Sequence, residues 1–137
     1  MFKKLSFLVF FILISCKQDV NKADIDLLNG YWEIAKVKLP NGKVKEYTIN
    51  EFIDFFEISE GKGFRKKVQP QFDGTFQSND TQESIQLSDS NNRFYLKYKT
   101  NFGKWTEQIV TIQDSVLVLK NDSLTYYYKR FKPLKVN

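Results

Sequence analysis

The alternation of apolar and polar residues from position 31 onward predicts a series of short β-strands separated by turns. Apolar residues recur at a spacing near two, which is the period of a half-buried strand and not of a helix. Clusters of Gly, Pro, Asn, Asp and Ser interrupt these runs about every ten residues, as in all-β barrels and sandwiches. The expected strands cover residues 31–39, 44–49, 52–58, 64–68, 72–77, 83–87, 93–99, 105–113, 115–120 and 124–131.

Three local features refine this pattern. Apolar residues in the segment 52–58 fit both the helical and the strand period, and we favour a strand. Pro70 cannot donate a backbone hydrogen bond, so we expect it at an edge, a bulge or the end of a strand. Gly61-Lys62-Gly63 predicts a turn. Because closing the sheet removes exposed strand edges, the fold class we expect is all-β, a single up-and-down antiparallel β-barrel of about eight strands.

The first fifteen residues have the composition of an export signal. Lys3 and Lys4 are followed by an apolar stretch over residues 5–14, in which Ser6 is the only polar residue. This stretch is about ten residues long, whereas a membrane-spanning helix needs about 20. Residues 1–15 are therefore predicted to be a secretory signal peptide.

The end of that segment, Leu13-Ile14-Ser15-Cys16, resembles the lipobox of bacterial lipoproteins. The resemblance implies a thioether-linked lipid on Cys16 and acylation of the new amino terminus, which together anchor a protein stably in a membrane. Residues 16–24 would then be the lipidated cysteine and a flexible tether. Lys17 differs from the Asp that retains enterobacterial lipoproteins in the inner membrane, so within the cell envelope we favour the outer membrane. The alternative is a plain signal peptide or a membrane helix that ends in Cys.

Two further motifs resemble the ends of a lipocalin-like domain. Gly30-Tyr31-Trp32 stands where the strand pattern begins, and Arg130 lies in the last expected strand. In that family a short helical turn leads to Gly-x-Trp, the Trp plugs the closed end of the barrel, and an Arg packs across the indole. The resemblance implies these barrel-closing roles for Gly30, Trp32 and Arg130, a lipocalin-like domain over residues 25–132 and a C-terminal tail over residues 133–137.

Charged residues are spread along the chain instead of being gathered in one place. Two of the 21 basic side chains lie in the signal segment and the others are balanced by 16 acidic ones, so the body is only mildly basic. A nucleic-acid partner is therefore not expected. The run Arg65-Lys66-Lys67 is interpreted as a solvated strand face, with a phosphate or lipid headgroup site as the alternative.

The sequence offers few groups for catalysis. It contains no His, and its single cysteine, Cys16, is assigned to lipid, so we expect no hydrolase triad and no zinc site with His or Cys ligands, and an internal disulfide cannot form. Carboxylates such as Asp54, Glu57 and Asp73 could act as acids or bases, but no motif pairs them. We expect no enzyme activity, no metal and no cofactor.

The aromatic residues supply most of the expected core, and some of them would line an apolar cavity if the barrel is open at one end. Two functions follow from this. The first is a membrane-anchored module that binds a small apolar or amphipathic ligand in the barrel. The second is an envelope protein-protein interaction module, such as an inhibitor or assembly factor, with a filled barrel. The aromatic residues concerned are Phe52, Phe55, Phe56, Phe72, Phe76, Tyr95, Tyr98, Trp105, Tyr126 and Tyr128.

Overall fold

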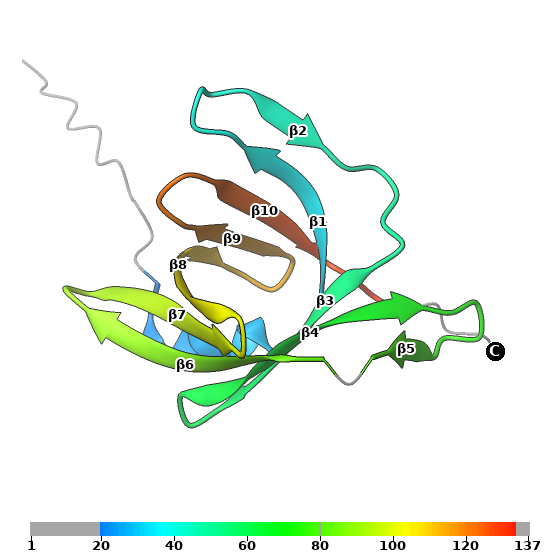
Figure 1. Cartoon of the computed structure of the whole chain (residues 1–137), viewed down its shortest axis with the longest axis horizontal. Coiled ribbons are helices and arrows are strands. Elements are labelled where there is room, and N and C mark those ends of the chain that lie inside the picture. The colour runs from blue at the N-terminus through cyan, green and yellow to red at the C-terminus, as the bar shows by residue number, and fades with distance from the viewer. Residues whose placement is uncertain (1–19, 80, 134–137) are drawn as a thin grey trace, which may run out of the picture.

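A computed structural model describes residues 20–79 and 81–133 of the chain. The signal peptide and the lipobox residues Leu13, Ile14, Ser15 and Cys16 lie outside the described residues. The described part consists of one short 3₁₀ helix and a ten-stranded sheet (Figure 1). The elements are η1 (Lys22–Leu28), β1 (Gly30–Lys38), β2 (Val44–Glu46), β3 (Ile53–Ser59), β4 (Lys62–Pro70), β5 (Phe76–Ser78), β6 (Glu83–Ser90), β7 (Arg93–Thr100), β8 (Gly103–Ile112), β9 (Val116–Lys120) and β10 (Thr125–Arg130).

The sheet closes on itself into an antiparallel barrel. The order around the ring is β1, β3, β4, β6, β7, β8, β9 and β10, and β10 pairs back with β1. The two remaining strands extend this ring. β2 pairs with the end of β1 while β3 pairs with its beginning, and β5 pairs with the end of β4 while β6 pairs with its beginning. The predicted up-and-down barrel of about eight strands is therefore confirmed.

Several local expectations are also confirmed. The segment expected over 52–58 is a strand, since β3 covers Ile53–Ser59, and Pro70 is the last residue of β4, where it faces Phe76 of β5. The turn before β4 is shorter than expected, because β4 already begins at Lys62 and Gly63 lies within it. The hairpin between β6 and β7 turns at Asn91 and Asn92, both with positive φ. Such a two-residue turn lets both strands extend further than the turn-rich sequence indicated.

Two expected strands are shorter than the pattern indicated. β2 covers only three residues of the segment 44–49. After Glu46 the chain stops pairing with β1, and β3 then pairs with the beginning of β1. The Asn50 amide bridges this change by donating to the Ile34 carbonyl (3.0 Å) and to the Glu33 carboxylate (3.1 Å). In the segment 72–77 the first residues form a turn, in which Asp73 accepts hydrogen bonds from the Thr75 backbone and hydroxyl. In both segments, hydrogen bonds made by the side chains of turn residues end a strand that the apolar periodicity alone would have continued.

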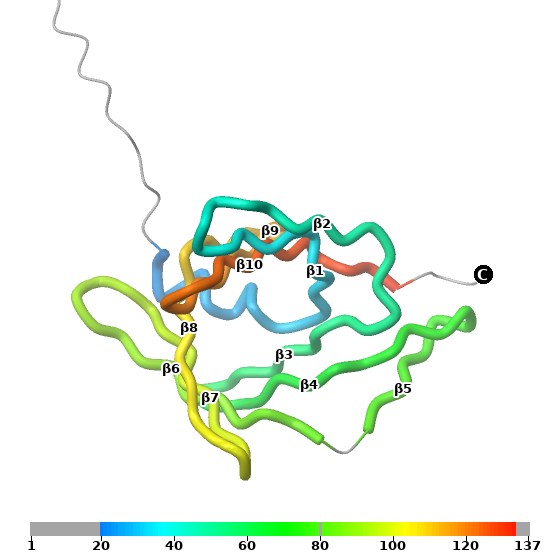
Figure 2. The backbone as a smooth tube through the Cα atoms, turned by 45° about the horizontal axis from the view of Figure 1, so that its top comes forward, coloured from blue at the N-terminus to red at the C-terminus, as the bar shows by residue number. Residues whose placement is uncertain are grey.

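Inward-facing side chains of β1, β3 and β6 to β10 form one core together with η1. The helix packs against β3 and β8, and Figure 2 shows it crossing between the walls of the barrel. η1 begins at Lys22, inside the segment 16–24 that was expected to be tether, and Val20 before it already packs against the core. The core residues are Ile25, Leu28, Trp32, Phe56, Ile58, Ile85, Phe94, Leu96, Tyr98, Ile109, Ile112, Leu117, Leu119 and Tyr128.

The expectation that the aromatic residues are mostly core is correct for some and wrong for others. Phe56, Tyr98 and Tyr128 are buried, whereas Phe72 is 96% and Phe52 50% exposed. The exposure of these two side chains follows from their positions in the chain. Phe72 lies in the turn between β4 and β5, and Phe52 lies in the loop before β3, so neither belongs to an inward-facing row of a strand. Hydrophobicity alone did not distinguish these places.

Candidate functional site

The closed end of the barrel is built around Trp32, which is fully buried. Its indole Nε1 donates a hydrogen bond of 2.8 Å to the Leu28 carbonyl at the end of η1. The Arg130 guanidinium lies over the indole, with its Cζ 4.0 Å from the ring centroid. This contact combines a cation-π attraction with packing, and it joins the first strand to the last.

Arg130 also caps backbone carbonyls that would otherwise be unpaired at this end. Its guanidinium donates to the carbonyls of Leu27, Asn29 (2.7 Å) and Asp114 (2.8 Å). Gly30 makes the approach feasible, because a Cβ there would lie 2.8 Å from Arg130 Nη1 and the backbone φ is +118°. The structure thus brings Gly30, Trp32 and Arg130 together in one contact group that joins η1, β1, β10 and the loop between β8 and β9.

Sequence reasoning missed one member of this group, Asn29. Its side-chain Oδ1 accepts a hydrogen bond from the Ile58 N–H (2.6 Å), and its Nδ2 donates to the Ile58 carbonyl (3.1 Å). This pair fastens the end of η1 to β3. An Asn directly before Gly-x-Trp is the only signal in the sequence, and it is too common to be noticed without the structure.

The second polar group lies inside the barrel and is centred on Arg65. Arg65 Nη2 forms an ion pair of 2.8 Å with Glu83, and Nη1 forms one of 3.2 Å with Glu107. Nη1 also lies 3.4 Å from the Tyr98 hydroxyl, and the guanidinium stacks 4.4 Å from the Tyr98 ring centroid. The side chain of Glu107 is only 5% exposed. Both carboxylates compensate the buried positive charge.

This placement corrects the interpretation of Arg65-Lys66-Lys67 as a solvated face. Arg65 pairs with Phe56 across the β3–β4 ladder, and both point into the barrel. Lys66 points to the outer wall, where it lies over aromatic rings, and Lys67 points inward again. Lys67 forms a 2.8 Å ion pair with the buried Asp54, although its own side chain is 60% exposed. A three-residue run therefore divides between two faces of one strand.

The three carboxylates considered for acid or base chemistry do not come together. Asp54 is buried beside Lys67, Glu57 is exposed on the same strand, and Asp73 is exposed in the β4–β5 turn. Asp54 Oδ1 has Lys67 as its ionic partner, but no hydrogen bond of good geometry reaches it from the described residues. The carboxylate that does share a site with another is Glu107, which no motif had indicated.

Burial sets the electrostatics of the Arg65 group. It raises the pKa of Glu107 above its ordinary value, against the opposing effect of Arg65 and of the Tyr98 hydroxyl. Burial alone would lower the pKa of Arg65. The electrostatic effect of Tyr98, the hydrogen bond to Glu83 and the charges of Asp54 and Glu107 outweigh burial and raise this pKa. Arg65 is thus a permanent cation whose donors are largely used by neighbouring side chains. The group fixes a polar layer within the barrel.

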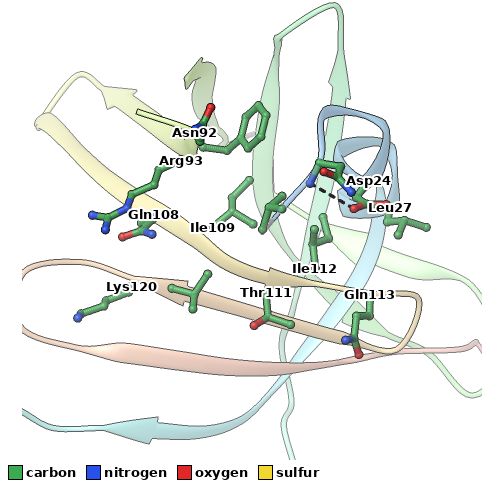
Figure 3. A pocket seen from close by; sticks show the side chains of 14 residues that line it. Asp24, Leu27, Asn92, Arg93, Gln108, Ile109, Thr111, Ile112, Gln113 and Lys120 are labelled. Carbon is green, nitrogen blue, oxygen red and sulfur yellow. Dashed lines mark hydrogen bonds between the residues drawn. The ribbon is translucent and has the colours of Figure 1, made fainter. Parts of the chain in front are cut away.

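A cleft of about 1180 Å³ lies between η1 and strands β7 to β9 of the barrel (Figure 3). Its base is apolar, formed by side chains that also belong to the core or pack against it. Its rim is polar and comes from both the helix and the strands. A register shift in β8 between Ile109 and Thr111 interrupts the ladder at this wall. The lining residues are Val20, Asn21, Asp24, Leu27, Asn92, Arg93, Phe94, Gln108, Ile109, Val110, Thr111, Ile112, Gln113 and Lys120.

The outer wall of the barrel carries an aromatic cluster, which we call the outer aromatic patch and which consists of Tyr31, Phe55, Phe64, Phe76 and Phe131. The rings of Tyr31 and Phe76 stack at 4.1 Å, and Tyr31 and Phe55 lie 4.8 Å apart. Phe64 and Phe131 extend the cluster at 6.0 and 6.1 Å from their neighbours. All five are half-buried. The patch is therefore a contiguous apolar surface outside the core.

Neither a metal-binding group nor a membrane-spanning helix is present in the part of the chain that the structure describes. Residues 20–79 and 81–133 contain no group of three or more side chains that could hold a metal ion. In the same residues, no helix has the length and apolar character needed to cross a membrane.

Comparisons with known proteins give two structural likenesses. A scan against protein-family models finds no match, and a search of curated proteins finds none either. A solved structure of a lipocalin-like protein from Bacteroides uniformis ATCC 8492 is similar over 77% of this chain and 99% of that one, with 14% identity and a TM-score of 0.48. An uncharacterized protein from Bacteroides eggerthii DSM 20697 is similar over 76% of this chain and 99% of that one, with 10% identity and a TM-score of 0.48.

Proposed function

We propose that this protein is a lipid-anchored binding protein of the bacterial cell envelope that holds a small amphipathic molecule in the cleft beside η1. The observation that carries the proposal is the cleft itself, which combines an apolar base with a polar rim in one concave space. Small-molecule sites are typically clefts of roughly 300–1,000 Å³ with apolar walls and a few polar groups. The cleft is slightly larger than this range, so it can hold a whole small molecule.

This proposal places the ligand between η1 and strands β7 to β9 instead of in the middle of the barrel. Core side chains occupy much of the barrel interior, and the Arg65 group adds a layer of paired charges there. A smaller hollow of about 550 Å³ near the start of β3 is lined by Ile34, Phe52 and Lys67 among others. A further hollow, of about 880 Å³, is lined by Tyr95, Trp105 and Leu124 among others. The cleft beside η1 is larger than both and draws its walls from more elements, which favours it as the ligand site.

The membrane attachment in the proposal is supported by the lipobox Leu13-Ile14-Ser15-Cys16 and the signal peptide before it. We propose lipid on Cys16 and location in the outer membrane. A Cys16→Ala variant should leave the membrane fraction when envelopes are separated, because the thioether anchor cannot form. The same variant remaining in the membrane fraction would contradict the anchoring.

We propose a binding role without catalysis. The carboxylates with unusual surroundings, Glu107 and Asp54, face Arg65 and Lys67, which use them as ionic partners. Neither carboxylate lines the cleft. A ligand there would meet hydrogen-bonding and charged groups of the rim but no acid-base pair.

The ligand proposal can be tested by native mass spectrometry of the protein purified from its own envelope. We expect a reproducible added mass that disappears on denaturation. A Thr111→Trp variant should lose this mass, because an indole at this half-buried lining position would fill the cleft. Ser84→Trp is the matched control, since Ser84 is exposed on β6 and does not line the cleft. Loss of the mass in both variants, or retention in Thr111→Trp, would contradict the cleft as the binding site.

The outer aromatic patch favours a second candidate function, that of an envelope protein-protein interaction module. Half-exposed aromatic rings in contact are typical of interface centres, and Phe72 stands 96% exposed in the turn before β5. Cross-linking in intact envelopes should then capture one reproducible partner. A Phe76→Ser variant should lose that partner while Thr111→Trp keeps it. The reverse result would exclude the patch as the interface.

A further inference from the structure

The charges in the cleft are unevenly placed. Arg93 and Lys120 are two of its three charged lining residues, and the third is Asp24. Figure 3 shows Arg93 and Lys120 on one side of the cleft, with Gln108 between them, and Asp24 and Leu27 on η1 at the other side. The basic side of the cleft is thus separated from its acidic residue.

The two basic residues are also free to bind. Both are exposed, and neither has an ion-pair or side-chain hydrogen-bond partner within residues 20–79 and 81–133. Asp24, in contrast, is engaged at the start of η1, where its Oδ2 accepts a hydrogen bond of 3.3 Å from the Asn21 N–H. An anion entering the cleft therefore meets uncompensated positive charge on the strand side.

The floor between these sides is apolar. Ile109 and Ile112 of β8 lie between the basic residues and η1 in Figure 3, and Leu27 of the helix also lines the cleft. Phe94 of β7 completes this surface. A ligand that spans the cleft would place an apolar part on these side chains and an anionic part beside Arg93 and Lys120.

The cleft also lies close to the expected membrane anchor. Val20 lines it, and Cys16 precedes Val20 by four residues. A fully extended chain spans at most about 3.3–3.6 Å per residue, so these two residues can be no more than about 14 Å apart. With lipid on Cys16, the cleft is held near the membrane surface, where amphiphiles are concentrated.

From these observations we infer that the cleft binds an anionic amphiphile, with its head group at Arg93 and Lys120 and its hydrocarbon part over Ile109 and Ile112. The inference rests on the proposed function, since it names the class of ligand for the same cleft. A free fatty acid and an anionic membrane lipid share this chemistry, and the tests below separate them.

The first test compares two probes that have the same chain and opposite charges. Residues 17–137 contain η1, the whole barrel and its core, and serve as the soluble protein. Dodecanoate and dodecyltrimethylammonium are titrated below their micelle concentrations, by calorimetry and by amide NMR shifts. We expect dodecanoate to bind at least about tenfold more tightly, with the largest shifts around Leu27 and Ile109. Equal affinities, or a preference for the cation, would overturn the inference.

The second test removes the charge from the cleft. Arg93→Glu combined with Lys120→Glu should weaken dodecanoate binding by about tenfold or more. Lys97→Glu combined with Lys99→Glu is the matched control, because both residues are exposed on β7 and outside the cleft, and the net charge changes equally. Thermal unfolding should show that both double variants remain folded. An equal loss of affinity in the control would overturn the head-group assignment.

The outcomes also separate this inference from the proposed function. If both probes bind in the cleft with equal affinity, the cleft remains a ligand site and only the anionic class is wrong. If neither probe shifts cleft residues, the proposed function fails as well. Co-sedimentation with vesicles of phosphatidylcholine containing phosphatidylglycerol, but not of phosphatidylcholine alone, supports the inference and assigns the ligand to membrane lipid. Dodecanoate binding without such co-sedimentation supports it and assigns a free amphiphile.

Discussion

Two arginines organise opposite parts of this barrel, and their surroundings differ in kind. Arg130 lies at the closed end, over Trp32, and donates to neutral backbone carbonyls. Arg65 lies inside the barrel between Glu83 and Glu107, and its partners are charged. A neutral partner costs less when the arginine is removed, whereas a buried carboxylate that loses its counter-ion is strongly destabilising. Substitutions in the interior charge group should therefore destabilise the protein more than substitutions at the closed end.

The largest expected effect comes from Arg65→Ala. Removing this side chain leaves Glu83 and Glu107 without their counter-charge, and we expect the free energy of unfolding to fall by about 3–5 kcal/mol. Denaturant unfolding followed by fluorescence measures this. Lys66→Ala, at the next position but on the outer wall, should change it by less than about 1 kcal/mol. Equal effects at the two positions would contradict the division of the run between two faces.

Arg130→Ala should have a smaller effect. The variant loses the cation-π contact and three hydrogen bonds to carbonyls, but those carbonyls lie at the end of the barrel, where water can replace the guanidinium. We expect a loss of about 2 kcal/mol in the free energy of unfolding. A loss larger than that of Arg65→Ala in the same experiment would reverse the comparison.

Gly30→Ala sharpens the description of the closed end. The new Cβ would approach Arg130 Nη1, and the φ of +118° is strained for any L side chain. We expect a loss of about 1–2 kcal/mol. Combining Gly30→Ala with Arg130→Ala should cost less than the sum of the two, because the steric contact is then gone. Strict additivity in this double-mutant cycle would show that the two residues do not act together.

The smallest expected effect is the dependence of stability on the ionisation of Glu107. Burial raises its pKa in the folded state above the ordinary value of 4.5. The unfolded chain therefore loses this proton first as pH rises, and the stability contributed by the protonated form is lost as pH increases through the raised pKa. Stability measured from pH 4.5 upward should thus decline more steeply in the native protein than in Glu107→Gln. Carbon-13 NMR of the carboxyl should give a pKa above 4.5, and a value below it would contradict this environment.

The two arginine regions also show what the sequence could and could not predict. Gly30, Trp32 and Arg130 were identified because they belong to a motif that is visible in the chain, and the structure places them in contact. Arg65 was misinterpreted because three consecutive basic residues resemble a solvated face. Strand alternation separates Lys66 from its neighbours, but only pairing with β3 and β6 shows which face is inside. Glu107 comes from a strand 42 residues away, and no local pattern joins it to Arg65.

The barrel was more predictable than the cleft for a related reason. Strand number and antiparallel order follow from local periodicity and turns, which each strand carries in its own residues. The cleft exists because η1 docks beside β8, and its lining combines the segment 20–27 with residues of β7, β8 and β9. Neither Arg93 nor Lys120 stands in a motif. Their common role is visible only when the fold brings them to one side of the same hollow.

The most direct test of the proposed function is to locate the bound molecule. Amide and methyl NMR spectra of the isotope-labelled protein should be recorded with and without the molecule that co-purifies from the envelope. We predict that the largest shifts map to Leu27, Ile109 and Ile112 beside η1, while the core residues Leu96 and Tyr98 stay unchanged. Shifts centred on Leu96 and Tyr98 would instead place the ligand in the middle of the barrel and contradict the cleft as its site.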